Sequence, residues 1–222
     1  MAEEDDASKT EDPTEKKLGD ARNKGDVAKS VEVNAWFLLI GGAMSLILFS
    51  PYVAENISKE ISIFVSAPHS IPPDFRHLQL LFSELLIDLG IILSPIFGLL
   101  VVLAIFSNAT QTGLIWTTEK IKPELSKISI VKGVKRLVSS RALVEFLKGI
   151  LKLFLVAIVA FGLAVPNLFD LALISDMEPV QSLERIHLLA IFLFMGTIAV
   201  MTVIAAADFV FQKHKFTQQM MM

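Results

Sequence analysis

Four long apolar stretches dominate the pattern of hydrophobic and polar positions along the chain. They cover residues of about 33–54, 85–107, 143–165 and 186–210. Each is close to the roughly 20 residues that an α-helix needs to cross a lipid bilayer. The pattern therefore predicts an all-α membrane protein with four hydrophobic helices in two hairpins, over 31–112 and 143–212.

The segments outside the hairpins define the remaining divisions of the chain. We expect a cytoplasmic N-terminal arm over 1–30, a long amphipathic loop over 113–142, and the start of a linker to a further cytoplasmic domain over 213–222. The loop is longer than the roughly 2–8 residues that usually connect the helices of a bundle. Its length predicts that it reaches around something outside the bundle.

The composition agrees with a chain that lipid or a large apolar partner must cover. Hydrophobic residues make up 53% and charged residues 19% of the 222 positions, and the mean hydropathy is +0.60. A soluble domain of this length is more polar. The absence of cysteine excludes disulfides, thiolate catalysis and thiolate metal sites. The first apolar run begins near Ala35, behind a long charged segment, so we expect a retained membrane helix and not a cleaved signal peptide.

Basic residues are distributed unevenly around the apolar stretches. Three lie in segments 55–84 and 166–185, namely Lys59, Arg76 and Arg185, whereas fourteen flank the stretches on the other side. Because lysine and arginine accumulate in the cytoplasmic loops of membrane proteins, both termini and the central loop are predicted to be cytoplasmic. Segments 55–84 and 166–185 are predicted to be loops on the outside. The net charge of −3 gives no indication of nucleic-acid binding.

The arm contains the signals of a short helix. Asp12 is the predicted N-cap, Pro13 the first helical residue and Gly25 the C-terminal stop. A helix over 13–24 is too short to be stable alone in water. Its only apolar contacts are Leu18 and Ala21. We therefore expect the arm to be ordered by docking onto its own bundle or onto a partner.

Proline and glycine positions predict two features of the first hairpin. Pro95 lies inside the second apolar stretch, where its ring removes a helical hydrogen bond and pushes against the carbonyl of Ile91, so we expect a kink. Contacts between membrane helices favour small residues, because these let two backbones approach closely. The first stretch carries such a run, formed by Gly41, Gly42, Ala43 and Ser45.

The central loop contains a basic amphipathic segment over 130–138. At 100° per residue, Ile130, Val134 and Leu137 fall within one apolar sector. The basic residues Lys132, Lys135 and Arg136 fall on the opposite side. Two interpretations are open, because the segment can rest on anionic lipid or dock its apolar face on a partner protein.

Charged residues inside the third and fourth apolar stretches need a partner or access to water. Glu145, Lys148 and Lys152 share one face of the third stretch, and burying such charges in hydrocarbon costs about 2.5–3.5 kcal/mol each. The lysines can extend toward the headgroups. Asp208, near the same end of the fourth stretch, is the natural partner, so we predict a membrane charge pair between Asp208 and Lys152 or Lys148. A proton relay, the other interpretation, requires carboxylates that face each other deep in the bundle.

Motifs of catalysis and cofactor binding are absent from the sequence. It has no Gly-rich phosphate-binding loop, no HExxH zinc motif and no nucleophile elbow. The four histidines share no metal-ligand spacing; they are His69, His77, His187 and His214. We therefore expect no enzyme activity, no cofactor and no metal.

Three segments of the chain resemble a known family. They are Glu11-Asp12-Pro13-Thr14-Glu15-Lys16-Lys17-Leu18 in the arm, Ile121-Lys122-Pro123-Glu124-Leu125-Ser126-Lys127-Ile128 in the loop, and Ala207-Asp208-Phe209-Val210-Phe211-Gln212 at the end of the fourth stretch. They resemble the FlhB/YscU/SctU family of type III secretion export-switch proteins, and the resemblance runs in order over essentially the whole chain. The acidic lead-in and the overall similarity favour the flagellar branch of this family over its injectisome branch.

The resemblance implies a four-helix membrane domain on the flagellar export gate in the bacterial inner membrane. Its central loop is expected to wrap the cytoplasmic entrance of the gate and to control opening. The implied partners are the gate subunits FliP, FliQ and FliR, together with FlhA, secreted flagellar proteins and membrane lipid. The loop residues expected to contact the gate are Ile121, Pro123, Leu125, Ile128, Ile130, Val134 and Leu137.

Self-cleavage is a further property of this family, at an Asn-Pro-Thr-His motif in a cytoplasmic domain after the fourth helix. This motif is not in the sequence, so self-cleavage is not assigned to it. The chain is expected to be the membrane half of a longer protein.

A small-molecule or ion transporter is the alternative function. Transporters often show paired broken helices or inverted repeats. Here both hairpins have the same predicted orientation, and a single apolar stretch has a central proline. These features favour the export-gate subunit.

Overall fold

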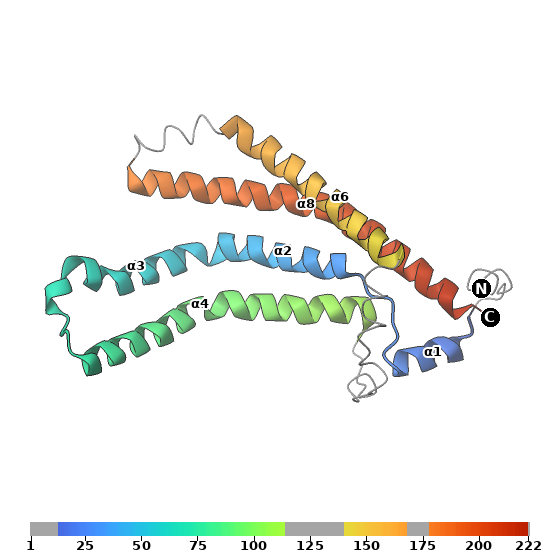
Figure 1. The fold of residues 1–222 in the computed structure, drawn as a ribbon, viewed down its shortest axis with the longest axis horizontal. Coiled ribbons are helices and arrows are strands. Elements are labelled where there is room, and N and C mark those ends of the chain that lie inside the picture. Colours follow the sequence, from blue (N-terminus) through green and yellow to red (C-terminus); the bar gives the residue numbers. More distant parts are fainter. Residues whose placement is uncertain (1–12, 114–139, 168–177, 222) are drawn as a thin grey trace.

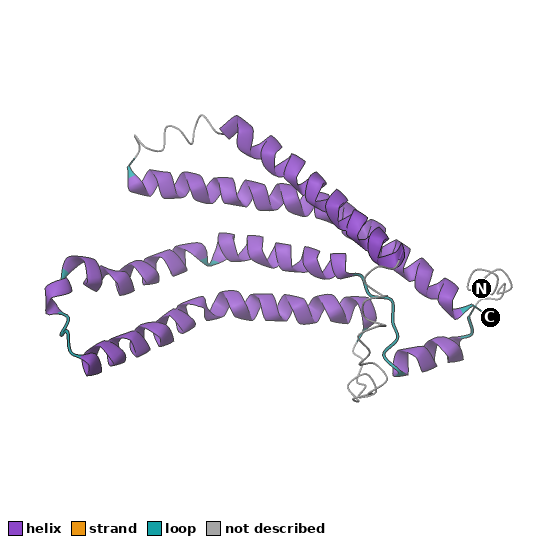
Figure 2. Cartoon of the chain, viewed as in Figure 1, coloured by secondary structure: helices purple, strands orange, loops and turns teal. Residues whose placement is uncertain are grey.

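The described part of the protein is α-helical. A computed structural model describes residues 13–113, 140–167 and 178–221, and within them it contains two hairpins and a short arm helix (Figure 1). The first hairpin consists of α2 (Val31–Leu48), α3 (Ser50–Ser66), the 3-10 helix η1 (Pro68–Ser70) and α4 (Phe75–Thr112). The second consists of α6 (Ser140–Ala164), η4 (Val165–Asn167) and α8 (Pro179–Met220), and α1 (Glu15–Asn23) forms the arm. Figure 2 shows that the loops described between these helices are short. The predicted all-α class is confirmed.

Four of the helices are long and apolar enough to span a membrane, which confirms the four predicted segments. They are Val31–Leu48, Phe75–Thr112, Glu145–Ala164 and Pro179–Met220, with mean hydropathies of 1.7, 2.8, 2.2 and 2.6 over their most apolar windows. The prediction of a loop over 55–84 was wrong, because α3 continues to Ser66 and α4 already begins at Phe75. A helix ends where a cap or a breaking residue stops it, and not where the chain leaves the lipid.

A side-chain cap fixes the start of α4 at the tip of the first hairpin. Asp74 accepts a hydrogen bond from the backbone N–H of His77 at 3.1 Å, and its second carboxylate oxygen lies 2.5 Å from Nδ1 of the same residue. The backbone and ring hydrogen bonds from His77 lower the pKa of Asp74. Aspartate at this position satisfies a backbone donor that the first turn of a helix leaves free.

The proline inside α4 does not end the helix, which continues on both sides of Pro95. Proline cannot donate to the carbonyl of Ile91, four residues earlier. The hydroxyl of Ser94 donates to this carbonyl instead, at 2.7 Å. The polar group that the proline leaves without its helical donor is thus satisfied within the helix. Figure 1 shows that α4 changes direction along its length.

The two hairpins converge at the end of the molecule where α1 and the C-terminal end of α8 lie, and they diverge toward their tips (Figure 1). We call the end where they converge the terminal end. Helix α2 lies between α4 and α8 and forms most of the contact between the hairpins.

Small residues permit this central position of α2. Gly41, Ala43 and Ser45 are buried, as expected for a small-residue face. A Cβ added to Gly41 would lie 2.8 Å from Leu103 Cδ1, and one added to Gly42 would lie 2.8 Å from Phe194 Cε1. The first glycine therefore brings α2 close to α4, and the second brings it close to α8.

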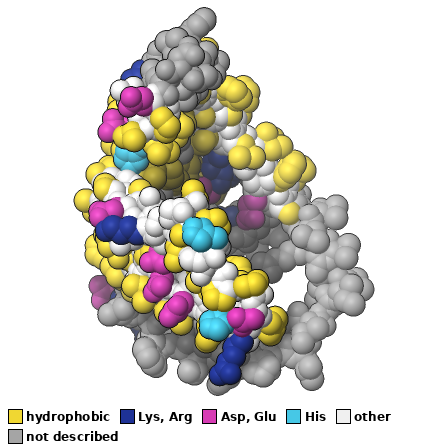
Figure 3. Space-filling view, turned by 90° about the vertical axis from the view of Figure 1, so that its left-hand side faces the viewer, with side chains coloured by type: hydrophobic (Ala, Val, Ile, Leu, Met, Phe, Trp, Pro, Cys, Tyr) yellow, Lys and Arg dark blue, Asp and Glu magenta, His cyan; other side chains and the backbone are white. Residues whose placement is uncertain are grey.

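Most large apolar side chains of the described helices are exposed. Leu153 and Val203 are 73% and 70% exposed, while the buried apolar residues are few and small or medium in size. Figure 3, viewed onto the hairpin tips, shows charged and histidine side chains among extensive hydrophobic surface. Such surface must be covered by lipid or by partner subunits.

Candidate functional site

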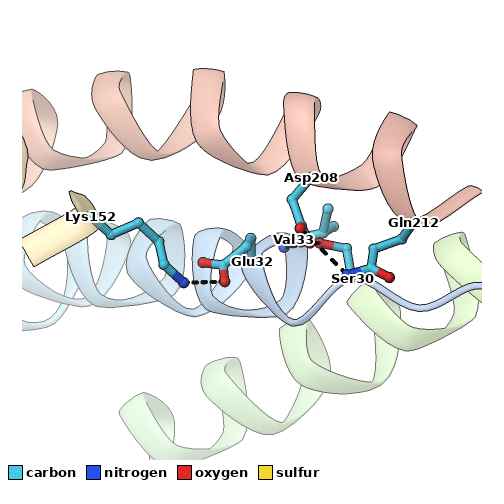
Figure 4. A network of polar contacts seen from close by, with 6 residues as sticks. All are labelled: Ser30, Glu32, Val33, Lys152, Asp208 and Gln212. Carbon is cyan, nitrogen blue, oxygen red and sulfur yellow. Dashed lines mark hydrogen bonds and ion pairs between the residues drawn. The ribbon is translucent and has the colours of Figure 1, made fainter. Parts of the chain in front are cut away.

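The residues that join the hairpins gather in a polar network at the terminal end, centred on Ser30. The hydroxyl of Ser30 donates to Asp208 Oδ2 at 2.6 Å, and its backbone N–H donates to Gln111 Oε1 at 2.8 Å. The same hydroxyl accepts from the backbone N–H of Val33 at 3.3 Å, which makes Ser30 the N-cap of α2. Ser30 is fully buried. Ser30 thus connects the start of α2 with α4 through its backbone N–H and with α8 through its hydroxyl. Figure 4 shows the bond to α8.

The network continues between α2 and α4. Asn34 Oδ1 accepts from Ser107 Oγ at 2.6 Å and from Gln111 Nε2 at 2.7 Å. Ser107 is also fully buried. Every polar group named here has a partner, and a satisfied buried network of this kind fixes one relative position of the helices that share it.

A second polar contact joins α2 to α8 nearly two turns further along. The indole N–H of Trp36 donates to Thr202 Oγ1 at 2.8 Å. Together with the bond between Ser30 and Asp208, it connects the first hairpin to the second at two levels.

An ion pair joins the hairpins next to this network. The ammonium of Lys152 on α6 contacts the Glu32 carboxylate on α2, with the two side chains 29% and 16% exposed (Figure 4). The neighbouring lysine, Lys148, places its ammonium 4.2 Å from the ring centroid of Phe211 on α8. Both lysines are therefore directed toward other helices.

The ion pair in the structure differs from the predicted one between Asp208 and Lys152 or Lys148. The carboxylate paired with Lys152 is Glu32, and Asp208 instead accepts hydrogen bonds from Ser30 and, at 3.5 Å, from Gln212 Nε2. Among the described residues, no ion pair joins Asp208 to Lys152 or Lys148. All three predicted residues nevertheless line one cavity of about 400 Å³ between α2, α6 and α8. The sequence thus predicted that these three charges lie close together, but it did not predict which groups pair.

The arm helix α1 is stabilised by local caps. Its N-cap is Thr14, whose hydroxyl accepts from the Lys17 backbone N–H at 3.4 Å. The prediction of Asp12 as the N-cap was wrong, because the helix begins two residues later and Thr14 caps it. Gly25 ends the helix as predicted, with a φ of 76° and with the Asp26 N–H bonded to the Ala21 carbonyl at 2.8 Å. This left-handed glycine and its backward bond form a Schellman motif.

The arm docks on the terminal end of its own bundle. Ala21 is buried, and Leu18 lines a cavity of about 490 Å³ that α4 and α8 complete with Gln111 and Phe216. The ammonium of Lys17 donates to the carbonyl of Met221 at 3.3 Å. The burial of Ala21 and the partial burial of Leu18 provide the support that the isolated helix lacks.

The loop that was expected to contact the export gate begins at this same place. Gly113 ends α4 with a φ of 69°, and the guanidinium of Arg22 from the arm lies against the position that a Cβ would occupy there. The predicted contact residues Ile121, Pro123, Leu125, Ile128, Ile130, Val134 and Leu137, and the basic residues Lys132, Lys135 and Arg136, lie outside the described residues.

The sequence reasoning missed most of the network. Ser30, Glu32, Asn34 and Gln111 were not selected as candidates. One signal could have identified part of it: Ser107 and Gln111 are four residues apart and therefore share a helix face, and Asn34 lies at the matching end of the first apolar stretch.

These features define a class: an integral membrane protein of two helical hairpins that a partly buried polar network joins at the terminal end. The chain belongs to the FlhB HrpN YscU SpaS family, which it matches over residues 7–222. It is 31% identical to the flagellar biosynthetic protein FlhB of Bacillus subtilis over 96% of this chain and 59% of that protein. It is 33% identical to the Yop proteins translocation protein U of Yersinia pestis over 96% of this chain and 60% of that protein.

Family membership confirms the resemblance found in the sequence. A third relative, the flagellar biosynthetic protein FlhB of Helicobacter pylori strain 26695, is 31% identical over 100% of this chain and 61% of its own length. The chain thus spans about 60% of the length of these relatives. The family and the four apolar helices identify an inner-membrane protein of this family, and they give no support to the transporter alternative.

Proposed function

We propose that the chain is a structural and gating subunit of the bacterial flagellar type III export apparatus. Its two hairpins and the loop 113–142 wrap the export gate formed with FliP, FliQ, FliR and FlhA, and they control its opening. One observation carries this proposal. Both ends of the loop, at Gly113 and Ser140, leave the bundle at the terminal end (Figure 1), next to the network that joins the hairpins. A displacement of the loop would therefore act on the contact between the hairpins.

The separation of the two hairpins toward their tips is a second observation that supports this proposal. Helices α4 and α6 have few contacts with each other and expose large apolar side chains along their lengths, such as Phe97 and Leu153. Apolar helices of a gate subunit match this surface in chemistry. The polar network then keeps the hairpins together at one end while a partner lies against them.

The terminal end is proposed to face the cytoplasm. In the described part, the basic residues at this end include Lys16, Lys24, Lys29, Lys213 and Lys215, whereas the tips carry Lys59, Arg76 and Arg185. Cytoplasmic segments of membrane proteins are enriched in lysine and arginine. Both termini and the loop are then cytoplasmic.

Single cysteines test this orientation without background, because the chain has no native cysteine. Ser70→Cys at the tip of the first hairpin should react with a membrane-impermeant maleimide in cells whose outer membrane has been made permeable. Lys24→Cys in the arm should react only after the inner membrane is opened. The reverse pattern would overturn the orientation, and blocking with a permeant maleimide controls for the reactivity of each cysteine.

A substitution in the loop tests the gate contact. Val134→Asp places a charge on the predicted apolar face, where it should prevent docking and reduce motility and flagellar protein secretion by about tenfold or more, since one buried unpaired charge costs several kcal/mol. Membrane insertion and protein level should not change. Lys135→Asp, on the opposite face of the same segment, is the matched control and should retain most of the motility. Equal tolerance of both variants would reject docking through this face.

Two phenotypes distinguish the flagellar branch of the family from the injectisome branch: swimming motility and the secretion of injectisome proteins. If this subunit serves the flagellum, its deletion should abolish flagella and swimming, and the gate subunits should co-purify with it in mild detergent. Intact flagella after deletion, with loss of secretion of injectisome proteins, would assign the subunit to the other branch.

A further inference from the structure

The cavity between α2, α6 and α8 combines an apolar wall with four charged groups. Its apolar side is formed by Leu151, Leu155 and Ile204, and Leu151 is still 58% exposed. Its charged groups are Glu32, Lys148, Lys152 and Asp208. The volume of about 400 Å³ is in the range of small-ligand sites. A ligand here would need both an apolar part and a polar part.

Three of these charges already have partners within the protein. Glu32 and Lys152 form an ion pair, and Asp208 accepts hydrogen bonds from Ser30 and Gln212. They leave Lys148 as the charged group of the cavity that is available to a ligand.

Lys148 belongs to a pair of lysines around one aromatic ring. Its ammonium lies 4.2 Å from the ring centroid of Phe211, and that of Lys215 lies 5.9 Å from the same centroid. Neither ammonium has a carboxylate partner among the described residues. Because Phe211 lines the groove, two positive charges lie beside the groove wall, and they are complementary to an anionic headgroup.

The position of this lysine pair along the helices matches the border of the membrane. The apolar part of α6 begins at Glu145, so Lys148 lies one turn inside it and Leu151 and Leu155 follow along the same side. An ammonium one turn from the end of a span reaches the level of the lipid phosphates. The groove therefore runs from headgroup depth into the hydrocarbon.

We propose that this groove is a binding site for one anionic phospholipid. Its phosphate lies between Lys148 and Lys215, and one acyl chain lies along Leu151, Leu155 and Ile204. The charge complementarity favours a lipid with a net negative headgroup over a zwitterionic one. A lipid bound here would fill the groove between the second hairpin and the start of α2, beside the ion pair that joins the hairpins.

Native mass spectrometry of the purified chain tests the site. The protein is released from detergent micelles that contain equal amounts of phosphatidylglycerol and phosphatidylcholine with the same acyl chains. The wild-type chain should retain one phosphatidylglycerol in preference to phosphatidylcholine. Each of the two lysines attracts an anionic headgroup as a basic residue does near an anionic surface. Replacing both, with Lys148→Gln and Lys215→Gln, should therefore lower the preference for phosphatidylglycerol by roughly 30-fold.

Two further variants keep the test decisive. Lys24→Gln with Lys213→Gln removes the same charge at the terminal end, away from this groove, and should leave the preference unchanged. Lys148→Arg with Lys215→Arg keeps the charge and should retain the bound lipid, which shows that loss in the glutamine variant does not arise from misfolding. A wild-type chain without preference, or an equal loss in both glutamine variants, would overturn the site. The first result would point to a protein segment as the occupant, and the second to general attraction by the basic surface.

Discussion

Glu32→Gln is expected to weaken the attachment of the second hairpin to the first by about 3 kcal/mol. The substitution leaves the ammonium of Lys152 in place without its counter-charge, and removing one member of a buried ion pair costs about 3–5 kcal/mol. The lower end applies because the Lys152 side chain is 29% exposed. The measurement is the midpoint of unfolding by a denaturing detergent in mixed micelles, followed by circular dichroism.

A double-mutant cycle distinguishes the ion pair from a general packing effect. Lys152→Met should be destabilising by itself, because it strands the Glu32 carboxylate. Combining it with Glu32→Gln should recover most of the loss, since an apolar side chain replaces the charge. The matched control is Glu55→Gln, which breaks the exposed pair with Lys59 and should change the unfolding midpoint far less, because solvent screens an exposed pair. Similar losses for Glu32→Gln and Glu55→Gln, with no coupling to Lys152, would contradict the assignment.

The membrane helices were predictable because each is encoded by one long, continuous run of apolar residues. An apolar run of about 20 residues can be satisfied in lipid only as a helix. The ends of the helices were less predictable. Local capping by Asp74, and not the limit of the apolar stretch, sets the start of α4. The small-residue face of α2 was also predictable, because close approach requires glycine at the contact.

The candidate site was predicted only in part, since pairing depends on how helices from different hairpins meet. The lysines on α6 required a carboxylate at the same depth, and in the sequence Asp208 on the fourth stretch meets this requirement. Glu32 lies in the first turn of α2, and nothing in the periodicity of α2 or α6 indicates that these two helices face each other there. Ser30 gave no signal beyond its suitability as an N-cap, and its bond to Asp208 is a tertiary contact.

The arm shows how local and tertiary signals combine. Gly25 was predicted from the sequence because only its left-handed conformation completes the Schellman motif. The sequence also indicated that α1 needs a surface to lie on. That this surface is formed by the ends of α4 and α8 follows only from the tertiary fold. The role of the loop over 113–142 stays a prediction.

Gly42→Val is expected to separate the hairpins where α2 meets α8 and to destabilise the protein by about 1–3 kcal/mol, the usual cost of overpacking a close contact. A Cβ at this position would lie 2.8 Å from Phe194 Cε1 and 3.4 Å from Cζ of the same ring. Either the ring or the helix must then move. The network between Ser30 and Asp208 lies further along the same contact and should be strained by that movement. In the bacterium, the variant should assemble less export gate and swim less well.

A matched control and a compensating substitution distinguish a clash between α2 and α8 from the intrinsic effect of valine on a helix. Gly98→Val makes the same substitution in a membrane helix where no neighbouring atom lies within 4 Å, so it should change the unfolding midpoint little. Phe194→Leu should partly rescue Gly42→Val, because the smaller side chain removes the ring edge that meets the new methyl groups. If Gly98→Val is as harmful as Gly42→Val, and Phe194→Leu rescues nothing, then helix propensity and not the contact between α2 and α8 accounts for the loss. Rescue confined to the Gly42 variant would show that this contact holds the two hairpins at their working distance.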